Sequence, residues 1–181
     1  MNYIIFDLEA TCWLGRPPKG INEIIEIGAV KVNDYAEIES SFIQFVKPAI
    51  NPVLSSFCKR LTSITQQQIN SASTCPSVIE AFQDWINIDY ENYTLISWGK
   101  YDKDQLRSDC ELHHINPDWV DHYYNLKPAY KKLKSLKHEL GLKKAIGLEG
   151  FEFTGKHHRA ISDAENLAKI FIKYFKEWPL E

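Results

Sequence analysis

The chain has 181 residues and a formal net charge of −3, from 21 lysines and arginines against 24 aspartates and glutamates. Hydrophobic residues make up 44% and charged residues 25%, which is typical of a globular protein and excludes a disordered or fibrous chain. No run approaches the ~18 apolar residues of a membrane-spanning helix, and the slightly acidic balance disfavours a protein that coats duplex nucleic acid. The length predicts one domain over residues 1–181.

The first predicted element is a strand over 3–9, whose nearly continuous apolar run indicates burial on both faces. Two more strands follow after short connections, which favours an antiparallel meander of three. Beyond it, the chain alternates between helical periodicity and short apolar runs. These predict helices over 55–61, 65–69, 77–86 and 102–114, strands over 24–32, 38–46, 94–98 and 120–124, two helices between 128 and 140 that end at Gly141, a loop over 143–156, and a last helix over 160–178. The order predicts an α/β fold with a mixed five-stranded sheet and helices on both faces.

Two acids interrupt the most apolar strand of the chain. Asp7 and Glu9 are two residues apart, so their side chains leave the same face of the strand, with Cα atoms roughly 6.5 Å apart. Burying two adjacent carboxylates is costly unless a cation lies between them. A divalent metal ion, a solvated strand end, and a pairing lysine or arginine all remain open.

Two further acids lie at the starts of helices. Asp102 follows a predicted strand, and either caps the helix with Gln105 as its capping-box partner or belongs to a site. Asp163 either extends the apolar stripe of the last helix, or follows a Ser162 cap paired with Glu165. His158 precedes Asp163 by five residues, either in a solvated basic loop or as a general base.

The four acids together favour one site at an edge of the sheet. Three or four carboxylates suit Mg²⁺ or Mn²⁺ better than zinc. Two such ions ~3.5–4 Å apart would hold a phosphodiester for in-line attack by water, and His158 would accept the proton of that water.

Three segments in this order resemble the DEDDh family of 3′-to-5′ exonucleases: IFDLEATC at 5–12, the pair Tyr101–Asp102, and HRAISDA at 158–164. The segments EIIEIGAV at 23–30 and FCKRLT at 57–62 resemble a narrower branch. That branch contains the histone-mRNA 3′-end and RNA-interference-regulating exoribonucleases, with bacterial relatives described as sporulation-pathway inhibitors.

The resemblance implies an RNase H-like fold, two Mg²⁺ or Mn²⁺ ions, and release of nucleoside 5′-monophosphates from a 3′-hydroxyl end. The expected substrate is RNA or short single-stranded nucleic acid. The resemblance assigns metal binding to Asp7, Glu9, Asp102 and Asp163, the general-base role to His158, contact with the terminal base to Phe57 and Tyr101, and contact with the terminal ribose to Ala10 and Thr11.

A basic segment lies between residues 126 and 144, with seven lysines and one acid, Glu139. It is either a solvated helical face or a track for the phosphates of a single strand. Two other functions stay open: a non-catalytic regulatory module on an exonuclease scaffold, and a proofreading exonuclease associated with a polymerase.

The cysteines are few and widely spaced, without a CxxC pair: Cys12, Cys58, Cys75 and Cys110. This spacing predicts free thiols in a reducing compartment, and therefore a cytoplasmic protein with no zinc site and no disulfide-linked partner.

Overall fold

The structure is a computed structural model that describes residues 1–180. Its six-stranded sheet has the order β4-β3-β2-β1-β5-β6. The strands are β1 (Asn2–Ala10), β2 (Ile24–Val32), β3 (Ile38–Lys47), β4 (Ser73–Thr74), β5 (Tyr93–Ser97) and β6 (Tyr123–Asn125). The helices are α1 (Ser56–Thr62), α2 (Gln66–Asn70), α3 (Cys75–Ile86), α4 (Tyr101–Leu112), α5 (Leu126–Leu133), α6 (Leu142–Leu148) and α7 (Ala160–Lys173), with 3₁₀ turns η1 (Pro18–Gly20), η2 (Asp118–Asp121) and η3 (Phe175–Glu177).

The predicted α/β class and the antiparallel meander of β1, β2 and β3 are confirmed. The sheet has six strands rather than the predicted five, because Ser73–Thr74 pairs in parallel with the end of β3. Two residues are too few to show a hydrophobic period, so β4 could not be predicted from the sequence. Strand β5 runs parallel to β1, and β6 runs parallel to β5.

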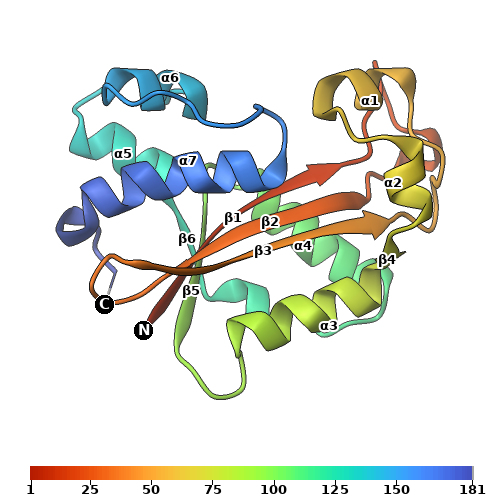
Figure 1. Ribbon diagram of the computed structural model, residues 1–181, viewed down its shortest axis with the longest axis horizontal. Coiled ribbons are helices and arrows are strands. Elements are labelled where there is room, and N and C mark those ends of the chain that lie inside the picture. The colour runs from red at the N-terminus through yellow and green to blue at the C-terminus, as the bar shows by residue number, and fades with distance from the viewer. Residues whose placement is uncertain (181) are drawn as a thin grey trace.

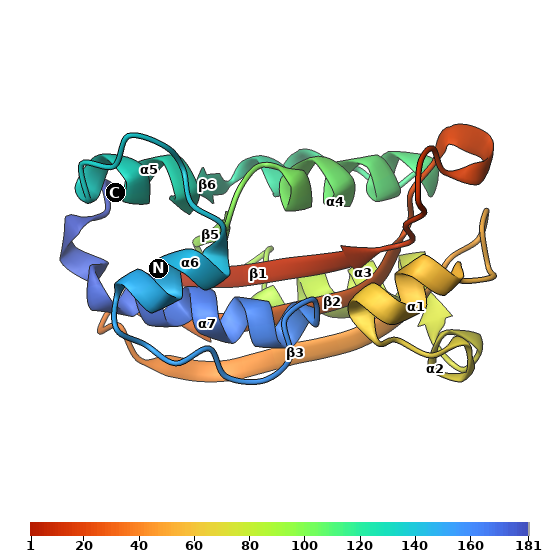
Figure 2. The same cartoon turned by 90° about the horizontal axis from the view of Figure 1, so that it is seen from above.

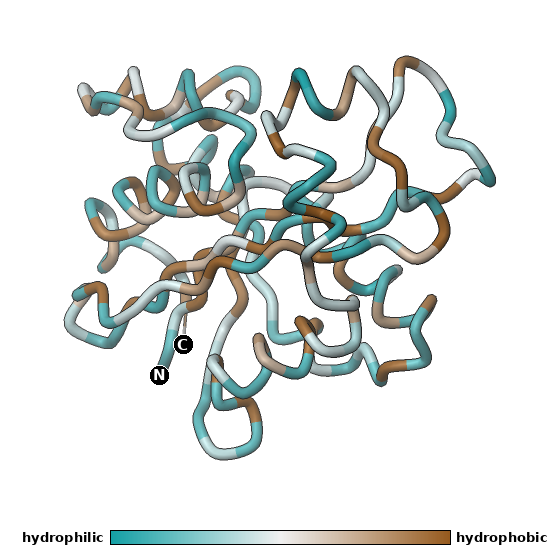
Figure 3. Tube along the Cα trace, turned by 45° about the vertical axis from the view of Figure 1, so that its right-hand side comes forward, coloured by the Kyte–Doolittle hydropathy of each residue, from teal (hydrophilic) through white to brown (hydrophobic). Residues whose placement is uncertain are grey.

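Helices cover both faces of the sheet, with α5, α6 and α7 on one side and α3 and α4 on the other (Figure 1). Seen from above, α6 and α7 lie together beside β1 (Figure 2). Apolar stretches concentrate along the central strands, and polar ones along the outer loops (Figure 3). Among residues 1–180, every helix is too short or too polar to cross a membrane.

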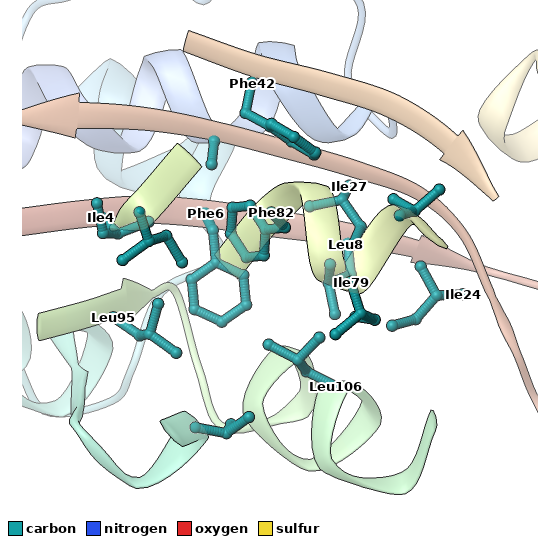
Figure 4. Close-up of a cluster of buried hydrophobic side chains, with 14 of the residues drawn as sticks. Ile4, Phe6, Leu8, Ile24, Ile27, Phe42, Ile79, Phe82, Leu95 and Leu106 are labelled. Atoms are coloured by element: carbon teal, nitrogen blue, oxygen red, sulfur yellow. The ribbon is translucent and has the colours of Figure 1, made fainter. Parts of the chain in front are cut away.

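Strand β1 is central and buried on both faces, as its apolar run predicts. Ile4, Phe6 and Leu8 pack against α3 and α4 (Figure 4). Tyr3 and Ile5 point to the opposite face and pack with α5, α6 and α7. Because side chains alternate along a strand, Asp7 and Glu9 continue the second face, toward the start of α7.

Several predicted element boundaries are wrong in the C-terminal half. Only one helix lies between 128 and 140, and Gly141 is the N-cap residue of α6 rather than the end of a helix. Helix α6 therefore occupies part of the predicted loop 143–156. The last helix ends at Lys173, and the chain continues through the turn η3. Strand β6 starts at Tyr123, because Val120 belongs to the turn η2.

Candidate active site

The carboxylates of β1 meet those of α4 and α7 at the carboxyl end of β1. Asp7, Glu9 and Asp163 each offer an oxygen, and these oxygens lie within 4.8 Å of one another. Glu9 is 8% exposed and Asp163 is 4% exposed. The sequence segments that supply these acids are far apart, and the sheet brings them to one cavity.

Asp102 is tied directly to β1. One of its carboxylate oxygens accepts a hydrogen bond of 3.2 Å from the backbone N–H of Leu8. The predicted capping role is wrong, because α4 begins at Tyr101 with Lys100 at the N-cap. Gln105 is not a capping partner, since its amide donates to the backbone oxygen of Asn22 and to Asp109. Asp102 therefore faces the site.

Asp163 lies inside the first turns of α7, which begins at Ala160. The alternative with Ser162 as the helix cap is wrong, because the Ser162 hydroxyl accepts from the Lys156 backbone N–H instead. The Asp163 carboxylate accepts a hydrogen bond of 2.9 Å from the backbone N–H of His158. It also lies 2.8 Å from the ring atom Nδ1 of His157.

The site holds more negative charge than its protein surroundings neutralise. Burial, and then Asp102, Asp163 and Glu9, raise the pKa of Asp7 well above its usual range. Burial and the neighbouring acids raise the pKa of Glu9 to about 8. Burial raises the pKa of Asp102 to about 7, although its hydrogen bond from Leu8 opposes the shift.

Within residues 1–180, none of these four acids forms an ion pair with a lysine or an arginine. This excludes the alternative in which a lysine or an arginine pairs with Asp7 and Glu9. A cation would lower the electrostatic free energy of the cluster. Clustered carboxylate oxygens are the ligands that Mg²⁺ and Mn²⁺ prefer. The residues present therefore fit a divalent metal site.

His158 lines the same cavity as the acids. Its backbone is left-handed, with φ of 64°, and its bond to Asp163 holds this conformation. Burial, and then the neighbouring His157, lower the pKa of the His158 ring. A neutral imidazole beside buried carboxylates is able to accept a proton near neutral pH.

Sequence reasoning did not single out His157. Its ring stacks on His158 with centroids 4.0 Å apart, and Phe153 packs edge-on against its other side. The only signal in the sequence was the presence of two adjacent histidines, which does not distinguish their roles.

The EIIEIGAV segment positions the start of α7. A Cβ atom on Gly28 would overlap the backbone of Ile161, so only glycine lets α7 lie this close to β2. Glu26, fully buried, accepts three hydrogen bonds from Arg159 and one from the backbone N–H of Ala160. These contacts fix the helix that carries Asp163 and the loop that carries His158.

The acids open into a cavity of about 380 Å³. Besides Asp7, Glu9, Asp102, His157, His158 and Asp163, its wall consists of Leu8, Ala10, Cys12, Leu61, Trp98, Tyr101, Gly141 and Leu142. The predicted residues Ala10 and Tyr101 belong to it, and Tyr101 is 53% exposed. Phe57 and Thr11 do not line it. Leu61, one turn after Phe57 on α1, lies there instead, and the Thr11 hydroxyl accepts from the Glu23 backbone.

A second group of potential ligands lies outside this cavity. Cys75, Asp109 and His113 also place ligand atoms within 4.8 Å of one another. The Asp109 carboxylate already accepts hydrogen bonds from the Ile24 backbone and from Gln105. We therefore assign Asp109 to the packing of α4 against β2 rather than to a metal.

The family model described as Exonuclease (RNase_T) matches residues 4–171. The chain belongs to the exonuclease family. The predicted resemblance to its DEDDh group is confirmed: the solved nuclease domain of 3′hExo, titled a DEDDh family member bound to rAMP, is 30% identical and superposes with a TM-score of 0.89, over 97% of this chain and 92% of that one. DEDDh exonucleases generally depend on divalent metal ions.

Curated relatives of this chain come from animals and bacteria. The chain is 34% identical to the Homo sapiens 3′-5′ exoribonuclease 1 over 182 residues, covering 96% of this chain and 52% of that protein. It is 33% identical to the Bacillus subtilis protein named "Probable 3'-5' exonuclease KapD", covering 93% of this chain and 82% of that one. The chain thus spans about half the length of the animal relative.

Proposed function

We propose that this chain is a 3′-to-5′ exonuclease that removes nucleoside 5′-monophosphates from the 3′ end of single-stranded RNA or DNA. The observation that supports this most is the gathering of Asp7, Glu9, Asp102 and Asp163 with His158 in one cavity. That these five groups line one cavity supports an enzyme over a non-catalytic module on the same scaffold. The relative's structure with rAMP supports a site for one nucleotide.

The four carboxylates are the residues that would hold two Mg²⁺ or Mn²⁺ ions. When bound, these ions would supply charge neutralisation and Lewis-acid activation for attack on phosphorus. The raised pKa values of Asp7, Glu9 and Asp102 support this assignment, because a bound cation removes the repulsion that raises them.

His158 acts as general base. Its ring nitrogen takes a proton from the attacking water while the water oxygen bonds to phosphorus. The bond between phosphorus and the 3′-oxygen of the preceding nucleotide breaks, and that oxygen gains a proton from solvent. The products are one nucleoside 5′-monophosphate and a shortened strand with a new 3′-hydroxyl.

The rest of the cavity wall orients the terminal nucleotide. Tyr101, Trp98 and Leu61 offer aromatic and apolar surface to the base, which binds any base because each has a π-face. Backbone groups near Ala10 contact the ribose, and Leu61 of α1 takes the place predicted for Phe57 beside the base.

The test uses 5′-labelled RNA and DNA oligonucleotides of matched sequence with Mg²⁺. We expect stepwise shortening from the 3′ end, lost with EDTA and in the Asp7→Ala variant. Asp89→Asn, which alters an exposed acid outside the cavity, serves as the control and retains activity. Internal fragments as first products, or full activity of Asp7→Ala, would contradict the proposal. The relative rates on RNA and DNA decide the sugar preference.

We also propose that residues 1–181 form one domain and that the protein works in a reducing compartment, the cytoplasm. All four cysteines are free, and Cys58, Cys75 and Cys110 are buried thiols. Cell fractionation tests the compartment, and a single cooperative unfolding transition tests the single domain.

A further inference from the structure

The basic segment between residues 126 and 144 carries seven lysines and one glutamate. The structure sorts these lysines into separate groups. Lys134 pairs with Glu149 at 3.2 Å and has a structural role. Lys132 lies in a different hollow, beside Glu177 and Trp178. The interpretation as a solvated helical face therefore explains only part of the segment. The lysines near the cavity need a separate explanation.

Three lysines of the segment lie next to the wall of the active-site cavity, in the sequence or in space, and we call Lys127, Lys143 and Lys144 the lysine lip. Lys143 and Lys144 follow directly after the wall residues Gly141 and Leu142. Both are exposed, and neither forms an ion pair with any residue in 1–180.

The remaining member of the lip lies beside the wall on its other side. The Lys127 side chain approaches Gly99, which stands between the wall residues Trp98 and Tyr101. Lys127 forms an ion pair with Glu139, at 3.7 Å, and that pair is partly exposed. The lip thus borders the wall formed by Trp98, Gly141 and Leu142.

The lip is held in place by the same contacts that close the cavity wall. The indole N–H of Trp98 donates to the backbone oxygen of Leu140 at 2.9 Å. Helix α6 starts immediately after, and the backbone N–H of Lys144 donates to the oxygen of Gly141 at 3.0 Å. The apolar side of α6 packs in the core through Leu142, Ala145 and Ile146, so the lysines stay on the outside.

We infer that the lysine lip binds the phosphates of the nucleotides upstream of the one being removed, and so selects single strands longer than two nucleotides. This inference rests on the proposed exonuclease function. Four acids line the cavity and would hold its metal ions, while the exposed Lys143 and Lys144 offer positive charge without an ion-pair partner in residues 1–180 next to the cavity wall. Lysine ammonium groups bind phosphate as point charges, without reading the sequence. Tyr101, a residue of the same cavity wall, adds base stacking, which is equally tolerant of sequence.

Salt dependence measures these contacts. Each phosphate neutralised in a single strand adds about −0.7 to the slope of log affinity against log salt concentration. Loss of two contacts therefore reduces the slope by about 1.4. A fourfold rise in salt then weakens the wild type about sevenfold more than a variant without these lysines.

The experiment compares Lys143→Gln/Lys144→Gln with Lys132→Gln/Lys176→Gln, which removes the same charge from exposed lysines outside the cavity wall. Both are tested on a 20-nucleotide strand and on a dinucleotide, which has no upstream phosphate. For the lip variant we expect kcat/KM on the long strand to fall about tenfold at low salt, with at most a twofold loss on the dinucleotide. The control pair should have the kcat/KM of the wild type on both substrates. Lys143→Arg/Lys144→Arg keeps the charge and should retain most of the preference for the long strand over the dinucleotide.

Equal losses on both substrates, an unchanged salt slope, or the same loss in the control pair would overturn the inference. Binding of the long strand in EDTA, followed by fluorescence anisotropy, separates the inference from the proposed function. If the wild type binds but does not cleave, the proposed function fails, while the lip variant still shows weaker and less salt-dependent binding. If the lip variant binds as tightly as the wild type, the inference fails even in an active enzyme.

Discussion

The Glu9 carboxyl provides a direct test of the electrostatics of the site, through the Glu9→Gln variant. Burial and the neighbouring acids raise its pKa to about 8, against an ordinary value of 4.5. At pH 7.5 this difference corresponds to about 4 kcal/mol of lost stability in the metal-free protein. Because the side chain borders a cavity open to solvent, we expect about half of that, or ~2 kcal/mol. For a chain of this length, this raises the Tm by about 4–8 °C.

The size of the effect depends on pH. A carboxyl whose folded pKa is raised contributes stability below its unfolded pKa, and this contribution is lost as the pH rises through the folded pKa. The Tm of Glu9→Gln should therefore equal that of the wild type near pH 4.5 and exceed it increasingly up to about pH 8.

Thermal unfolding followed by fluorescence in EDTA, from pH 4.5 to 8.5, measures this difference. Adding Mg²⁺ should raise the Tm of the wild type and close the gap. Glu80→Gln, which changes an exposed glutamate of α3, should show no pH-dependent gain. If Glu9→Gln were no more stable than the wild type at pH 8, the four acids would not repel one another as we infer.

Further perturbations test the other parts of the site and its support. His158→Ala should lower kcat by about 10²–10⁴-fold, as measured by single-turnover cleavage, while calorimetry still shows Mn²⁺ binding. If the variant lost Mn²⁺ binding, His158 would be a metal ligand rather than the general base. Gly28→Ala should destabilise the protein by about 1–3 kcal/mol in urea, because the added Cβ overlaps the backbone of α7, whereas Gly147→Ala, with open space at its Cβ, should not. Burial alone would raise the pKa of the Glu149 carboxyl. Hydrogen bonds from two lysines and two tyrosines have the larger, opposite effect and lower its pKa to about 2. Glu149→Gln should therefore cost about 1–2 kcal/mol above pH 4.5, and this cost should vanish as the pH falls to 2, as seen in urea titrations across this range.

The sequence was sufficient to predict the central strand and the acids on it. Alternation along 3–9 put Asp7 and Glu9 on one face, and the structure keeps both on the face that meets α7. The 3.6-residue period left two interpretations of Asp163 open, and the structure confirms the one that puts it on the apolar stripe of α7. These features are periodic and local, so a single sequence reports them.

Other features depend on long-range contacts and were not predictable from local signals. The position of Asp102 at a helix start favoured a capping role. Its carboxylate instead accepts a hydrogen bond from the backbone N–H of Leu8, which is distant in the sequence, so no local signal could predict this contact. Gly141 looked like a helix end, yet it begins α6, since Trp98 holds the preceding backbone at the cavity. Leu61 entered the cavity wall in the place expected for Phe57, because the orientation of α1 depends on packing against β2.

The central claim is that four carboxylates from β1, α4 and α7 hold divalent cations. Calorimetric titration of the metal-free protein with Mn²⁺ tests it most directly, with Asp7→Asn as the variant and Asp89→Asn as the control. We predict two ions per chain for the wild type and the control, and loss of this binding in Asp7→Asn. Unchanged Mn²⁺ binding by Asp7→Asn would contradict the claim.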